Sequence, residues 1–292
     1  MKAFRLSPCF KPCSFFIRNL SFKFIFIFSF FCISVYGNDE IEQLIYQSFD
    51  CIEKENYTCA EESLKDALRK EPANSRNGLL LANLGTVQRI LGKSEDALLS
   101  YHAALSLMPD ESSLLMSRAA LYAEMDSIEA ALIDYNQVLQ KNPQDELALY
   151  AAGLIYLQEN DTLSAKNYFS KILAVNSNSP NGKIGYGMIY RKERNFQAAD
   201  VLFSEVIQNH PENYFAYMQR AVLYFETNKN AKALEDINVY LSHFPDDEYA
   251  YFLRGQIKLQ LWEKKSAYDD FQQAKLLCYD EKQVNQLIER LK

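Results

Sequence analysis

The chain has 292 residues, of which 48% are hydrophobic, and only 9 glycines and 8 prolines. This composition supplies enough apolar material for a substantial core and few residues that break regular backbone. It therefore argues against a disordered chain and a disulfide scaffold, and it favours a folded, mostly helical protein.

The first 37 residues contain five basic residues, no acidic residue and an apolar run of 13 residues from Phe24 to Tyr36. A basic segment, an apolar run and a small residue after it, Gly37, are typical of an export signal. We expect cleavage after Gly37, which gives a periplasmic or secreted protein. The run is shorter than the ~20 residues that cross a bilayer. An uncleaved anchor that holds the protein at the membrane, facing the periplasm, is the alternative.

Removal of this segment would change the formal net charge from −7 to −12, because five cations and no acid would leave. So acidic a chain is expected to repel nucleic acid and anionic lipid, and the sequence offers no basic stripe to offset this charge. Nucleic acid is therefore not an expected partner. Membrane contact is expected only if the N-terminal segment is uncleaved.

Two cysteines, Cys51 and Cys59, lie at the facing ends of the first two expected helices. In an oxidising compartment they are candidates for a disulfide, and the alternative is that both are small buried apolar residues. Metal binding needs more ligands than this, and the three histidines of the chain are scattered. We expect no metal and no cofactor.

From Ile41 onward, one 34-residue pattern occurs seven times. Its eighth residue is small, its twentieth is always alanine and its twenty-fourth is usually large. Two antiparallel helices approach closely only where small residues separate them, so we expect a helical hairpin in each unit. The large residue is expected to fill the space between one hairpin and the next. The units are residues 41–74, 78–111, 112–145, 146–179, 180–213, 214–247 and 248–281.

Residues 280–292 follow the last unit and place Val284, Leu287, Ile288 and Leu291 on one helical stripe. Asp280 and Gln283 have the spacing of a capping box. A repeat array needs such a terminal helix, because its last repeat would otherwise expose an apolar face to water.

The clearest unit has Gly187, Tyr190, Ala199, Phe203 and Pro211 at the spacings small-x2-Tyr, Ala-x3-aromatic and Pro. In this it resembles the tetratricopeptide repeat family. The resemblance implies an all-α fold over residues 38–292. The expected architecture is a right-handed superhelical solenoid of about seven helix-turn-helix hairpins plus a C-terminal capping helix. It also implies a protein that holds other proteins or peptides in a concave groove.

Groove-facing positions of the resembled family are read here as the second, fifth, ninth and twelfth residues of a unit. The apolar character of these positions predicts a groove for a hydrophobic helix or extended peptide. An aromatic stripe at helical spacing is, however, more often part of a buried core. The expected groove residues are Tyr150, Leu154, Ile184, Met188, Arg191, Phe215, Met218, Phe225, Tyr249 and Phe252.

Motifs of catalysis are absent from the sequence, which has no glycine-rich phosphate loop, no H-E-x-x-H and no G-x-S-x-G. The acid pairs Asp246-Asp247 and Asp269-Asp270 are interpreted as solvated charge. The sequence therefore predicts a non-enzymatic scaffold of the cell envelope that binds a protein or peptide. The alternative is a self-associating or membrane-tethered component of an envelope assembly.

Overall fold

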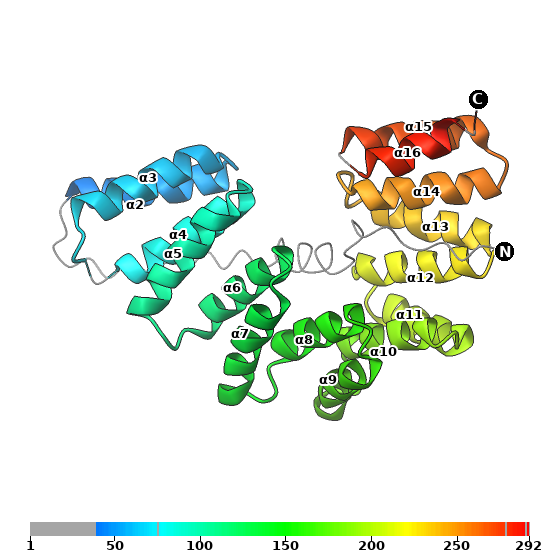
Figure 1. Cartoon of the computed structure of the whole chain (residues 1–292), viewed down its shortest axis with the longest axis horizontal. Helices are drawn as coiled ribbons and strands as arrows, with labels where there is room; N and C mark the ends of the chain where they lie inside the picture. The colour runs from blue at the N-terminus through cyan, green and yellow to red at the C-terminus, as the bar shows by residue number, and fades with distance from the viewer. Residues whose placement is uncertain (1–38, 75, 278, 290, 292) are drawn as a thin grey trace. The chain divides into compact units, whose positions relative to one another are not determined.

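The computed structural model describes residues 39–292 except residues 75, 278, 290 and 292 (Figure 1). The described residues form fifteen α-helices and no strand, which confirms the expected all-α repeat solenoid. The helices are α2 (Asp39–Glu53), α3 (Tyr57–Lys70), α4 (Asn77–Ile90), α5 (Ser94–Leu107), α6 (Ser112–Glu124), α7 (Ile128–Lys141), α8 (Glu146–Gln158), α9 (Thr162–Val175), α10 (Pro180–Lys192), α11 (Phe196–Asn209), α12 (Tyr214–Glu226), α13 (Asn230–Leu241), α14 (Glu248–Gln260), α15 (Lys264–Leu276) and α16 (Glu281–Glu289).

The helices divide into two compact units between α8 and α9, within the fourth expected repeat. We call residues 39–158 the N-terminal unit and residues 159–292 the C-terminal unit. Each unit is described by itself. The expected export signal, residues 1–37, lies outside the described residues.

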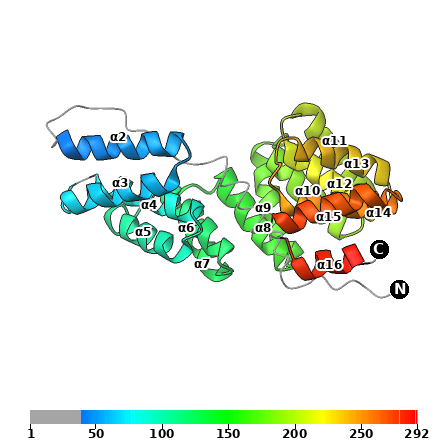
Figure 2. The ribbon, with the colours of Figure 1, turned by 90° about the horizontal axis from the view of Figure 1, so that it is seen from above.

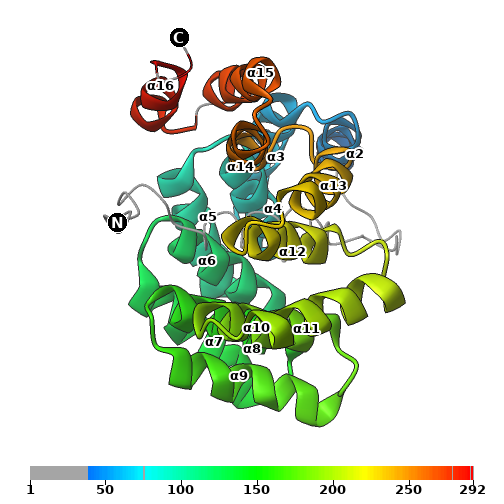
Figure 3. The ribbon, with the colours of Figure 1, turned by 90° about the vertical axis from the view of Figure 1, so that its right-hand side faces the viewer.

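Consecutive helices pack as hairpins in both units. In the N-terminal unit the pairs are α2 with α3, α4 with α5 and α6 with α7 (Figure 2). In the C-terminal unit they are α10 with α11, α12 with α13 and α14 with α15 (Figure 3). The first helices of neighbouring C-terminal repeats also touch one another, α10 with α12 and α12 with α14. These three first helices therefore lie side by side.

Small residues allow the close approach of the two helices in a hairpin. All seven alanines at the twentieth position are fully buried. A Cβ added to Gly187 would lie 2.5 Å from the ring of Phe203 in the same hairpin, and one added to Gly185 would lie 2.5 Å from Phe169 of the preceding hairpin. The large residue at the twenty-fourth position thus packs within its own hairpin as well as between hairpins, which extends the expectation from the sequence.

The turn between the two helices of each repeat places its fifteenth residue in the left-handed region. Gly92 has φ +73° there, which glycine adopts without steric cost. The same conformation occurs at six residues that carry a side chain, and it closes each hairpin in the same way. They are Glu55, Asp126, Asn160, Arg194, Asn228 and Trp262.

The terminal helix α16 covers the last hairpin. Its Val284 and Ile288 are buried in one cluster with Phe252, Phe271 and Tyr279. The backbone N–H of Gln283 donates a hydrogen bond to the Asp280 carboxylate over 3.1 Å, as the capping-box spacing predicts. This helix removes the apolar end of the C-terminal unit from water.

Candidate partner-binding site

Six of the ten residues expected to line a groove are buried instead, with 1% to 7% of each side chain exposed. Side chains with so little exposure present no surface to a partner. Phe252, for example, stacks on Tyr279 with a ring separation of 4.4 Å. This finding corrects the sequence interpretation in favour of its core alternative. The six are Tyr150, Leu154, Ile184, Met188, Met218 and Phe252.

The other four expected residues are partly exposed and come from the three adjacent first helices of the C-terminal unit. Arg191 lies on α10, Phe215 and Phe225 lie on α12, and Tyr249 lies on α14. We call these four residues the inner face. It combines one cation with three aromatic rings, which is a composition typical of protein interfaces.

Arg191 is held by an ion pair between repeats. It is the twelfth residue of its unit, and its Nη1 donates to the Glu226 carboxylate in the next unit over 3.1 Å. The N-terminal unit has the same pair at the same positions, but Arg89 donates there through Nε over 2.9 Å and through Nη2 over 2.6 Å to Glu124. Arg191 Nε is buried and finds no acceptor among the described residues. The C-terminal arginine therefore keeps donor capacity that its counterpart has used.

The charge of Arg191 acts on two titratable neighbours. Partial burial, with a contribution from the Arg191 charge, lowers the pKa of Lys192. Burial raises the pKa of Tyr249 to about 12, and both Arg191 and Glu226 act on this phenol by Coulomb interaction. The Arg191 charge, which the Glu226 carboxylate offsets in part, is what an anionic group of a partner could meet here.

A second set of arginines, which the sequence interpretation missed, ties the two helices of a hairpin together. Arg220 donates to both oxygens of Asp236 over 2.7 and 2.9 Å, and it also reaches Ser204 of the preceding repeat. The seventh residue of the repeat is the arginine and the twenty-third is the aspartate. The same pairs are Arg118 with Asp134 and Arg254 with Asp270.

The interpretation of two acidic dipeptides as solvated charge is wrong for their second residues, Asp247 and Asp270, and holds for the exposed Asp246 and Asp269. Asp270 is buried and binds both Arg254 and Lys258. Asp247 is buried as the N-cap of α14, where it accepts from the backbone N–H of Ala250 and from the Tyr240 hydroxyl over 2.7 Å. Burial raises the pKa of Asp247 to about 6. Both carboxylates are therefore structural.

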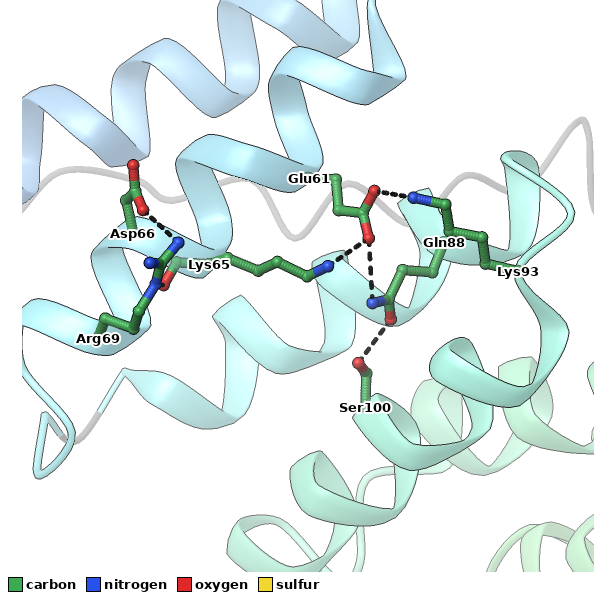
Figure 4. Close-up of polar contacts among 7 residues, drawn as sticks. All are labelled: Glu61, Lys65, Asp66, Arg69, Gln88, Lys93 and Ser100. Atoms are coloured by element: carbon green, nitrogen blue, oxygen red, sulfur yellow. Dashed lines mark hydrogen bonds and ion pairs between the residues drawn. The ribbon is translucent and has the colours of Figure 1, made fainter.

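In the N-terminal unit, Glu61 of α3 anchors a polar network that reaches α4 and α5 (Figure 4). Lys65 and Lys93 each donate to its carboxylate over 2.6 Å, and Gln88 bridges it to Ser100. Burial alone would raise the pKa of Glu61, but these hydrogen bonds outweigh it and lower the pKa to about 2. The network joins the first two hairpins through charge.

Cys51 of α2 and Cys59 of α3 form a disulfide, with their Cα atoms 5.8 Å apart. The bond closes the first hairpin of the N-terminal unit. Among the described residues, no group of three or more histidines, cysteines and acids has the arrangement of a metal site. No helix within the described part of the chain has the length and apolarity needed to cross a membrane.

Models of the tetratricopeptide repeat match residues 147–179 and 187–248. A crystal structure of a tetratricopeptide repeat protein from Parabacteroides merdae is 39% identical, covers 87% of this chain and 99% of its own, and superposes with a TM-score of 0.73. This chain belongs to the tetratricopeptide repeat family. Members of the family are generally non-catalytic scaffolds for protein interactions.

Two more distant solved structures resemble the chain in fold alone. Pseudomonas aeruginosa pilF is 19% identical, over 76% of this chain and 98% of its own, with a TM-score of 0.55. Yeast Tom70 is 16% identical, over 96% of this chain and 72% of its own, with a TM-score of 0.64. A comparison with curated protein sequences gave no match to this tetratricopeptide repeat protein.

Proposed function

We propose that the protein holds a protein or peptide partner on the inner face of the C-terminal unit, with an acidic group of the partner bound by Arg191. The observation that carries this proposal is the buried Nε of Arg191, which has no acceptor among the described residues. A buried donor without an acceptor is unfavourable, so the partly exposed Arg191 side chain would gain by turning this N–H toward a partner carboxylate that accepts the hydrogen bond.

The three aromatic residues of the inner face would bind apolar side chains of the partner. Phe215, Phe225 and Tyr249 are partly exposed on helices that lie side by side. Such rings accept the apolar side chains of an amphipathic helix or an extended segment. The expected partner segment therefore carries apolar residues next to an aspartate, a glutamate or a C-terminal carboxylate.

Affinity capture from the native cell, with quantitative mass spectrometry of the recovered proteins, tests this proposal. Two variants of the inner face, Arg191→Gln and Phe225→Ser, are each expected to lower recovery of the partner at least roughly tenfold, the usual effect of losing a charged hydrogen bond or an aromatic anchor. Val201→Ser is the matched control, because Val201 is exposed on α11. Equal recovery by all three variants would contradict inner-face binding.

We further propose that the protein works in the cell envelope. The basic and apolar composition of residues 1–37 supports export, and so does the disulfide between Cys51 and Cys59, because such bonds persist in oxidising compartments. Mass spectrometry of the N-terminus of protein from the native cell tests the location. A start at Asn38 supports a released protein, whereas an intact N-terminus supports a tethered assembly component.

A further inference from the structure

The turns that join first and second helices in the C-terminal unit form a row along one edge of the stack, because the hairpins stack in the same orientation. These turns and the first residues after them carry six exposed basic residues, which we call the basic edge. Arg194, Lys229, Lys232, Lys264 and Lys265 make no ion pair within the described part of the chain. The six residues are Lys192, Arg194, Lys229, Lys232, Lys264 and Lys265.

Fewer acids lie on the same turns. They are Glu193, Glu226 and Glu263, and Glu226 is already bound to Arg191. Each of the three turns therefore has an excess of positive charge. The expectation that the chain lacks a basic stripe is wrong for this edge, because the stripe is assembled from three separate repeats.

The N-terminal unit has the opposite charge at the equivalent turns. Glu53 and Glu55 outnumber Lys54 at the first of them, where Lys54 is paired with Asp50, and Asp126 and Glu129 lie at the third. The lysine of its second turn, Lys93, is bound to Glu61 over 2.6 Å. The basic edge is thus a local property of the C-terminal unit and does not follow from the repeat itself.

Trp262, the only tryptophan of the chain, lies on the basic edge directly before Glu263, Lys264 and Lys265. Its side chain is 84% exposed and its φ is +66°. A bulky residue is unfavourable in the left-handed region, where glycine or asparagine would fit with less strain. The fifteenth residue of every repeat adopts this conformation, so the backbone does not set Trp262 apart. Its large exposed apolar ring does, because burial does not explain a tryptophan here, and this exposure points to a role in binding.

We propose that the basic edge, with Trp262 at its end, docks on an anionic lipid surface. Tryptophan favours the boundary between lipid and water, and nearby lysines are attracted to anionic headgroups. A row of turns offers a narrow contact, which is suited to a flat and deformable lipid surface. A stable protein interface, in contrast, needs about 800 Å² of complementary area on each partner. This docking is separate from the inner face and does not depend on the proposed partner.

The fluorescence of Trp262 reports such docking directly, because no other tryptophan contributes to the signal. The protein as processed by its native cell is titrated with vesicles of phosphatidylglycerol and phosphatidylcholine, and separately with vesicles of phosphatidylcholine alone. We expect the emission to shift to the blue and to be quenched by brominated lipid with the anionic vesicles only. We expect this response to weaken as the salt concentration rises.

Three variants separate the contributions. Lys264→Gln with Lys265→Gln is expected to lower vesicle partition, measured by co-sedimentation, roughly 20-fold to 30-fold, given the usual effect of two basic residues near anionic lipid. Trp262→Asn, which places the asparagine of repeats four and six at this position, is expected to fold and to partition more weakly. Lys171→Gln, an exposed lysine on α9 away from the edge, is the control and is expected to partition like the native protein.

An unchanged Trp262 emission with anionic vesicles would overturn the proposal. So would equal partition of the double lysine variant and the native protein. A blue shift caused by an acidic peptide such as polyglutamate, with none caused by vesicles, would show that the edge binds an acidic protein instead.

Discussion

Arg89 in the N-terminal unit meets Glu124 with two short hydrogen bonds, whereas Arg191, at the same repeat position in the C-terminal unit, meets Glu226 with one. The turns of the two units also differ in the sign of their charge. In the N-terminal unit these charges are therefore already paired within the unit. A disulfide closes its first hairpin, and the Glu61 network joins the first hairpin to the second. The C-terminal unit keeps exposed charge and aromatic surface, which is what a binding region requires.

The largest expected effect comes from breaking a hairpin pair in the C-terminal unit. Asp236→Ala leaves Arg220 without its carboxylate partner, so we expect a loss of about 3 kcal/mol in the free energy of unfolding. Hydrogen exchange read by mass spectrometry should show the loss in residues 159–292 and not in residues 39–158. The exposed neighbour provides a control, because Glu235→Ala is expected to change little. Equal loss of protection in both units would show that they unfold together.

Removal of the disulfide should affect the other unit. Cys51→Ser with Cys59→Ser is expected to destabilise the N-terminal unit by about 2 to 3 kcal/mol, the usual value for a short closed loop. Denaturant unfolding of the native protein with and without a reducing agent gives the same comparison. The reductant should have no effect on the double variant. Identical midpoints for the oxidised and reduced native protein would contradict a stabilising bond.

Asp247 gives the C-terminal unit a stability that falls as the pH rises. Burial raises the pKa of this carboxyl to about 6 in the folded chain, so the folded state binds the proton more tightly than the unfolded state does. Stability is therefore lost between about pH 4 and pH 6 and stays lower above that range. Asp247→Asn keeps a capping oxygen and should add up to about 2 kcal/mol at pH 7. The exposed residue Asp246, changed to Asn, is the control, and a pH profile unchanged by Asp247→Asn would refute this account.

Glu61 gives the N-terminal unit the opposite pH dependence, with the smallest effect. Its lowered pKa of about 2 means that the folded state favours the ionised carboxylate. This contribution is fully present above about pH 4.5 and is lost as the pH falls toward 2. Because Lys65 and Lys93 are partly exposed, we expect Glu61→Gln to cost only about 1 kcal/mol at pH 7. Thermal unfolding of the native protein and of Glu61→Gln from pH 2 to pH 7 measures this loss of stability, with Glu62→Gln as the control. If Glu61→Gln destabilises the protein as much at pH 2 as at pH 7, the ionised Glu61 carboxylate is not the source of the stability.

The fold could be predicted from the sequence because the small residues that let two helices pack closely recur at the same positions in seven repeats. Ala199 and Gly187 are small for a reason that any two packed helices share, so spacing alone identifies them. The arginine and aspartate of the hairpin pairs were also visible as columns at the seventh and twenty-third positions. These arginine and aspartate residues are present in only three repeats. A pattern defined by small and aromatic residues does not include them.

The site was predictable only in part, because burial depends on neighbours that spacing does not reveal. Met188 and Phe225 both lie at expected groove positions, yet Met188 is buried and Phe225 is partly exposed. Arg191 was identified from the sequence, but the sequence does not show that its Nε lacks an acceptor among the described residues. That difference becomes clear only from the structure, where Arg89 makes two hydrogen bonds to Glu124. The basic edge was missed because its residues come from three turns that are about 34 residues apart in the sequence.

Photo-crosslinking in the native cell tests the central claim most directly. A photoreactive residue is placed at Phe225 on the inner face in one strain and at the exposed residue Val201 of α11 in another. Our account predicts one protein partner crosslinked from position 225, lost when Arg191→Gln is added, and absent from position 201. The same partner crosslinked equally from both positions, or only from position 201, would contradict recognition by the inner face.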